Sequence, residues 1–151
     1  MKKMIKTCSA LMAVLMMMLL APATVKAENC SSTVDVMCTA FNKMKGEVNE
    51  LKSIGELETL NFDETLSSID FDNIPDSCAD YVLTSVDKNK LIKSFDGFVD
   101  ALAAKTSALS EGIISKAMME ETLKPQLDTF HNLVKQSKTF GDVIVKMNEV
   151  F

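Results

Sequence analysis

The chain lacks arginine and tryptophan altogether, and it has one tyrosine and one histidine. The arginine guanidinium is the usual bidentate clamp for phosphate and carboxylate groups, so its absence disfavours nucleotide and nucleic-acid ligands. A phosphate-binding glycine loop, a Gly-x-Ser-x-Gly turn and a His-Glu-x-x-His pair are also missing from the sequence. Because His131 is the only histidine and no motif marks a nucleophile, the sequence predicts a protein that is not an enzyme and uses no cofactor.

Long hydrophobic runs are scarce as well. The run Ala10–Ala21 has 12 residues, short of the ~18 that span a bilayer. Three lysines precede it within the first six residues, and Val25–Ala27 offers small residues at the two positions that signal peptidase reads. We therefore expect a bacterial type of signal peptide at residues 1–27, with Ala23 as the alternative cleavage site. The remaining residues, 28–151, form a single domain that is secreted or periplasmic.

Loss of the first 27 residues would make the chain strongly acidic. It takes away four of the 16 lysines and none of the 21 acidic residues, so 12 lysines face 21 acids and the net charge is −9. Such a surface repels phosphate backbones and anionic lipid headgroups. We expect neither a nucleic-acid partner nor a stable membrane anchor in this domain.

The segment Leu91–Leu109 organises the predicted fold. Its large apolar residues recur at gaps of four, three, four and seven: Leu91, Phe95, Phe98, Leu102 and Leu109. On a helix these residues fall on one line. A second line, about a third of a turn away, consists of small residues: Gly97, Ala101, Ala104 and Ala108. Because only a narrow strip with Asp96 and Asp100 is polar, the helix should be central and packed on two sides.

The other segments also show helical periodicity. A stripe with gaps of three and four predicts a first helix that begins at Ser32 or Thr33 and ends at Gly55; the stripe is Val34, Met37, Phe41, Met44, Val48 and Leu51. Glu56–Asp76 is irregular but too apolar for a disordered linker. Pro75 suits the first turn of a helix over Asp76–Leu83, after which Asp87 caps the central helix if the chain breaks there.

The carboxyl-terminal part is predicted to be helical with interruptions. A helix begins near Ile113, and Pro125 should produce a kink or a new start. The last helix is expected to run from Leu123 to Phe151, with Gly141 loosening or breaking it locally. The fold class is therefore all-α: a small bundle of about four main helices plus one or two short ones.

Three cysteines remain beyond the signal: Cys30, Cys38 and Cys78. In an oxidising compartment they predict one disulfide and one free thiol, with pairing between two molecules as the alternative. Cys30 and Cys38 in one straight helix would lie ~12 Å apart, too far to bond. Cys78 is therefore the favoured member, with Cys30 or Cys38 as its partner. A zinc site of these cysteines and His131 is disfavoured because no tight Cys-x2-4-Cys knuckle is present.

The small-residue line of the central helix has two interpretations. It lets another helix approach closely, which we favour, or it leaves a slot for an apolar ligand between helices. The ligand-binding residues in that case are Gly97 and Ala101, with Phe95 and Phe98 beside them. No other cluster is stronger: the acidic turn Asp70–Asp76 departs from the EF-hand pattern, and Asp96 with Asp100 is explained by solvation.

These features predict an exported, acidic helical protein that binds a protein partner. The motivation is the export signal, the acidic balance and the lack of a catalytic set. The alternative is a carrier of a small apolar molecule held between helices. A filled seam between the central helix and the neighbour of its small-residue line would favour the interaction protein, and an open slot above ~300 Å³ there would favour the carrier.

Overall fold

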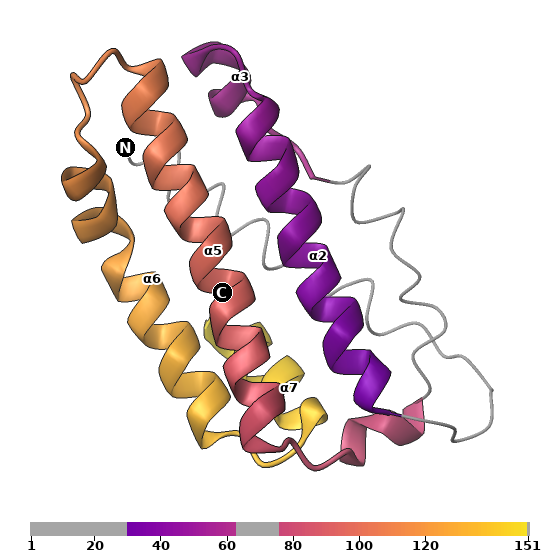
Figure 1. Cartoon of the computed structure of the whole chain (residues 1–151). Helices are drawn as coiled ribbons and strands as arrows, with labels where there is room; N and C mark the ends of the chain where they lie inside the picture. Colours follow the sequence, from indigo (N-terminus) through magenta and orange to yellow (C-terminus); the bar gives the residue numbers. More distant parts are fainter. Residues whose placement is uncertain (1–29, 63–75, 151) are drawn as a thin grey trace.

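The computed structural model describes residues 30–62 and 76–150. Its helices, coloured along the chain in Figure 1, are α2 (Ser31–Glu50), α3 (Ile54–Glu58), α5 (Ser85–Leu109), α6 (Lys116–Gln136) and α7 (Phe140–Val150), with a 3-10 helix η2 (Asp76–Asp80). The described part is all-helical, with four long helices, as the periodicity predicted. The predicted signal peptide and most of the acidic turn Asp70–Asp76 lie outside the described residues.

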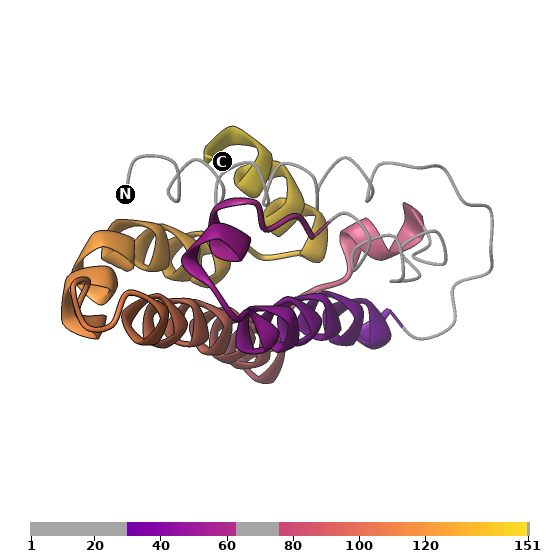
Figure 2. The ribbon, with the colours of Figure 1, turned by 90° about the horizontal axis from the view of Figure 1, so that it is seen from above.

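The helix α5 lies at the centre of the bundle, as expected. In Figure 1, α2 and α5 begin at the same end of the molecule, and α6 returns in the opposite direction. Rings from all three helices meet: Phe41 of α2 lies 5.3 Å from Phe95 of α5 and 5.8 Å from Phe130 of α6, and the last two are 4.2 Å apart. Seen from above (Figure 2), α3 and α7 lie over the row formed by α2 and α5.

Polar side chains of α5 also join the helices. Lys105 donates to the carbonyl of Asn49 at 2.7 Å, and Lys88 donates to the carbonyl of Lys135 at 3.0 Å. Both acceptors lie in the last turn of a helix, where carbonyl groups lack intrahelical partners and the helix dipole favours a cation. Lys90 pairs with Asp35 of α2 at 2.9 Å. The central helix therefore holds the ends of both neighbours.

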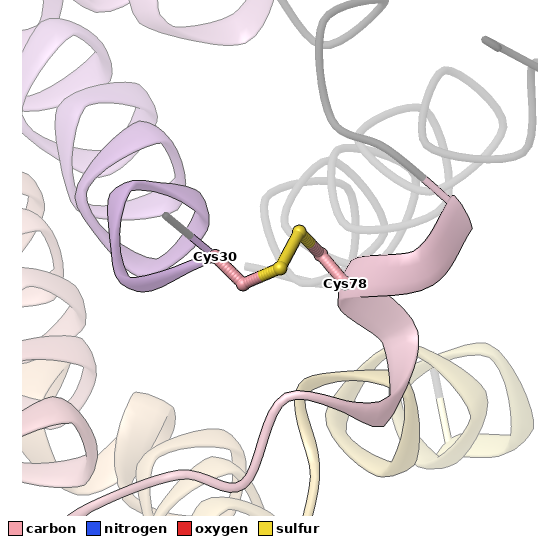
Figure 3. The surroundings of a disulfide bond; sticks show 2 residues. All are labelled: Cys30 and Cys78. Carbon is pink, nitrogen blue, oxygen red and sulfur yellow. A yellow bond between two sulfur atoms is a disulfide. The ribbon is translucent and has the colours of Figure 1, made fainter. Parts of the chain in front are cut away.

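A disulfide joins Cys30, at the start of α2, to Cys78 in η2 (Figure 3). The Cα atoms are 5.2 Å apart, and Cys38 is free and buried. The prediction of one bridge containing Cys78 is confirmed, and of the two alternatives Cys30 is the partner. The predicted cap at Ser32 or Thr33 is wrong: the N-cap is Cys30, whose side chain makes no capping hydrogen bond and is held by the bridge.

The first helix also ends earlier than predicted. It stops at Glu50, and Gly55 lies inside the short helix α3, whose N-cap Ser53 accepts a hydrogen bond from the backbone of Glu56. Ser53 favours a new helix start over the continuation of α2, because its hydroxyl accepts a hydrogen bond from the Glu56 backbone N–H, which has no partner within α3.

The segment before α5 is not the predicted helix over Asp76–Leu83. It is 3-10 only as far as Asp80 and then extended, because Leu83 donates to the carbonyl of Lys138 and Phe140 donates to that of Tyr81, both at 2.9 Å. These bonds flank the isolated bridge between Val82 and Thr139. Asp87 does not stand at the N-cap: Thr84 does, and Asp87 completes the capping box from the first turn.

The new helix start that was the second alternative at Pro125 is wrong, since α6 runs through this residue. Pro125 is exposed, so the carbonyl that loses its partner can be hydrated. The helix instead ends at Gln136, where the buried Ser137 hydroxyl donates to the carbonyl of Leu133 at 2.8 Å. Gly141 does not break α7 but brings it close to η2: a Cβ atom there would lie 2.9 Å from the carbonyl oxygen of Ala79.

Candidate functional site

An open groove of about 650 Å³ runs between the antiparallel helices α5 and α6. It is lined by Asp96, Val99, Asp100, Ala117, Glu120, Glu121, Lys124 and Leu127. Val99 is buried and Leu127 is half-buried, so with Ala117 they give the groove an apolar floor. The flanking side chains carry four carboxylates and one ammonium group. The groove is thus apolar below and acidic at its edges.

Lys116 forms ion pairs at the end of the groove that lies near the turn between α5 and α6. Its ammonium lies 2.6 Å from Asp100 of α5 and 3.5 Å from Glu120 of its own helix. The hydrogen bond to Asp100 raises the pKa of Lys116 above its ordinary value. All three side chains are about half exposed, so the cluster orients carboxylates at the surface and adds little to folding stability.

His131 contacts Asp96 of α5 at the other end of the groove. Its Nε2 atom lies 2.6 Å from Oδ1 of Asp96, and the histidine side chain is 27% exposed. The sequence pattern did not indicate this partner on α5.

The four residues predicted to bind an apolar ligand do not line this groove. Phe95 and Phe98 are buried in the core, where the Phe98 ring lies 5.9 Å from that of Phe62. Ala101 is buried as well. Gly97 is covered by Lys45 of α2, because a Cβ atom on the glycine would lie 3.4 Å from Lys45 Nζ.

The small-residue line packs over only part of its length. Ala104 and Ala108 are exposed, so the close approach predicted for the whole line is wrong at these two positions. The helix turns its small flank partly to solvent because α2 and α6 cover the line of large apolar residues instead. Asp96 and Asp100, predicted to be merely solvated, line the groove from α5 together with Val99.

The contribution of α6 was not found from the sequence. Ala117, Glu120, Glu121 and Lys124 fall at spacings of three and four, which on a helix place them on one side. That spacing was a usable signal. The spacing does not specify that this side of α6 faces Asp96 and Asp100 of α5.

Metal chemistry finds no support in the part of the chain that the structure describes, where no group of three or more potential ligands is close enough to hold an ion. The disfavoured zinc set is ruled out as such, since Cys30 and Cys78 are bonded to each other. Likewise, no helix among the described residues has the length and apolarity needed to cross a bilayer. Comparisons with known protein families, characterised proteins and solved structures found no match.

Proposed function

We propose that this protein acts by binding a partner protein and that the groove between α5 and α6 is the contact surface. The observation that carries the proposal is the groove itself, a concave surface of about 650 Å³ with an apolar floor and charged edges. Surfaces of this make-up are typical of recognition sites, in which apolar contacts supply affinity and polar edges supply orientation.

The two helices that form the walls of the groove favour its use as a binding surface. Both walls belong to long helices whose inner faces are locked by the contact of Phe95 with Phe130. Lys116 and His131 each contact α5 from α6, one near either end of the groove. A surface built on rigid elements loses little conformational entropy when a partner binds.

The alternative, a carrier of an apolar molecule beside Gly97, has less support. Lys45 covers the glycine, and Phe95 and Phe98 are engaged with other rings. The open groove is edged by carboxylates, which a purely apolar molecule would desolvate without compensation. A protein segment with polar groups of its own meets both requirements.

Export is part of the proposal. The disulfide between Cys30 and Cys78 is of the kind that persists in oxidising compartments outside the cytoplasm. Together with the signal-like residues 1–27, it supports action in the periplasm or outside the cell.

Site-specific photo-crosslinking tests the proposal. A benzophenone amino acid is placed at position 117 in the groove, or at position 108 on the exposed small flank of α5 as the control. The protein is then irradiated in cultures of its own host. We expect one discrete crosslinked product from position 117 and none from position 108. Equal labelling from both positions, or no product at 117, would contradict the assignment of the groove.

A further inference from the structure

We infer that the occupant of the groove is a cationic amphipathic helix of the partner protein. This inference rests on the function proposed above and specifies the chemistry of the partner. It follows from the shape of the groove, its floor and the charges along its edges.

The shape fits a helix. Two antiparallel helices in contact leave a furrow along their length, and a third helix packs into it at the distances usual for helix pairs. The lining of α6 extends from Ala117 to Leu127, which at 1.5 Å per residue is about 15 Å. An occupying helix would therefore contact the groove over about three turns.

The floor requires an apolar stripe on that helix. Val99, Ala117 and Leu127 offer no polar side-chain atoms, so the occupant must present apolar side chains at spacings of three, four and seven residues. Ala117 is exposed and small, which leaves room for a large side chain above it. A helix that is polar on all sides would gain nothing from this floor.

The edges require positive charge. Asp96, Asp100, Glu120 and Glu121 face one lining cation, Lys124. The contacts of Asp96 with His131 and of Asp100 with Lys116 each engage Oδ1, and a carboxylate can accept several hydrogen bonds on its two oxygens. Lysine or arginine side chains flanking the apolar stripe of the partner would thus find acceptors already held in place.

Charge also argues against a second copy of this chain as the occupant. Residues 28–151 contain 12 lysines and 21 acidic residues, so two copies repel each other. An acidic partner helix would likewise meet carboxylates along both edges and be repelled by them. Charge complementarity therefore favours a basic helix of a partner protein.

Selection from a displayed library of helical peptides, about three turns long, tests this inference on the disulfide-bonded protein. We expect enrichment of lysine or arginine beside an apolar stripe. A selected peptide should bind at least about tenfold more tightly than a version with glutamate in place of its cations, and than a version with its apolar residues redistributed. Enrichment of acidic or uncharged sequences, or equal affinity of the three peptides, would overturn the inference.

Variants place the binding in the groove. Glu121→Lys should weaken the selected peptide roughly five- to tenfold, whereas Glu58→Lys, the same charge change on exposed α3, should leave affinity within about twofold. Equal weakening by both variants would show non-specific attraction and overturn the inference. If no peptide is enriched but position 117 still crosslinks a partner, the cationic helix is wrong and the proposed function stands; if position 117 captures nothing either, both fail.

Discussion

Asp87 accepts a hydrogen bond from the hydroxyl of Tyr81 at 3.0 Å, across the point where the extended segment enters α5. The same carboxylate oxygen accepts from the backbone and the hydroxyl of Thr84, at 2.9 and 2.7 Å, and the residue is only 6% exposed. Three donors thus converge on one buried charge. This cluster fixes the start of the central helix, on which the core and the groove both depend.

Removal of the Asp87 carboxylate should therefore destabilise the fold. Asp87→Ala leaves the Tyr81 hydroxyl and the Thr84 amide without their acceptor, at a cost of about 1–3 kcal/mol in the free energy of unfolding. Asp87→Asn keeps an acceptor oxygen and should lose less. Urea denaturation of the two variants checks the order, and equal stability of Asp87→Ala and the unmodified protein would contradict it.

The same contact predicts a spectroscopic shift, because Tyr81 is the only tyrosine in the chain. Its hydrogen bond to Asp87, together with partial burial and the nearby negative charge, raises the pKa of Tyr81 above the ordinary value near 10. Titration of phenolate absorbance should show this elevation, and Asp87→Asn should move the pKa back toward the ordinary value. An unchanged Tyr81 pKa in the variant would contradict the hydrogen bond between Tyr81 and Asp87.

Acid should weaken the start of α7 in a defined window. Hydrogen bonds from the backbone of Thr139 and Lys138 lower the pKa of Asp142 below its ordinary value. The stabilisation is then fully present above the unfolded-state pKa of about 3.9 and is lost as the pH falls through the lower folded-state value. The stability difference between the unmodified protein and Asp142→Asn should therefore be constant near neutral pH and shrink below about pH 4. A difference that grows in acid would contradict the assignment.

Two glycines should respond oppositely to alanine. At Gly141 a Cβ atom would lie 2.9 Å from the carbonyl oxygen of Ala79, so Gly141→Ala must separate α7 from η2 and destabilise the protein. At Gly46, on the exposed side of α2, no atom lies within 4 Å of such a Cβ, and Gly46→Ala should stabilise by about 0.5–1 kcal/mol. Thermal unfolding of both variants measures the signs. A stabilising Gly141→Ala would refute the close approach of the two segments.

The disulfide should make a large contribution to stability. Cys30 and Cys78 are separated by 48 residues. Closing a loop of that size lowers the entropy of the unfolded chain and thereby stabilises the folded protein by about 4 kcal/mol. The Cys30→Ser, Cys78→Ser double variant should lose a comparable amount. Peptide mapping after unfolding without reductant should find alkylation at Cys38 but not at the other two positions. Alkylated Cys78 in that experiment would mean a different pairing.

Periodicity predicted what is buried better than where helices end. The stripe from Val34 to Val48 and the line from Leu91 to Leu102 are buried because spacing alone decides which residues share a helix face. Helix ends depend on a few local bonds that spacing does not encode. The start of α2 depends on a covalent bridge to Cys78, and the start of α5 depends on the capping box of Thr84.

The sequence does contain one signal for the start of a helix, a threonine followed three residues later by an aspartate. Thr84-x-x-Asp87 and Thr139-x-x-Asp142 share the spacing of a capping box, and each begins a long helix. The groove could not be predicted in the same way. Its α5 side was visible as Asp96 and Asp100, but its other wall depends on how α6 docks, which no local pattern specifies.

The account depends most on the claim that the groove between α5 and α6 binds the partner, and filling the groove tests this claim directly. Ala117→Trp places a large ring over the floor, and Ala108→Trp makes the same substitution on the exposed small flank of α5. The amount of partner captured from the host's culture by each purified variant is compared with that captured by the unmodified protein, after circular dichroism shows all three to be folded. We predict that Ala117→Trp loses most of the capture and that Ala108→Trp retains it. Equal capture by the two folded variants would contradict the account.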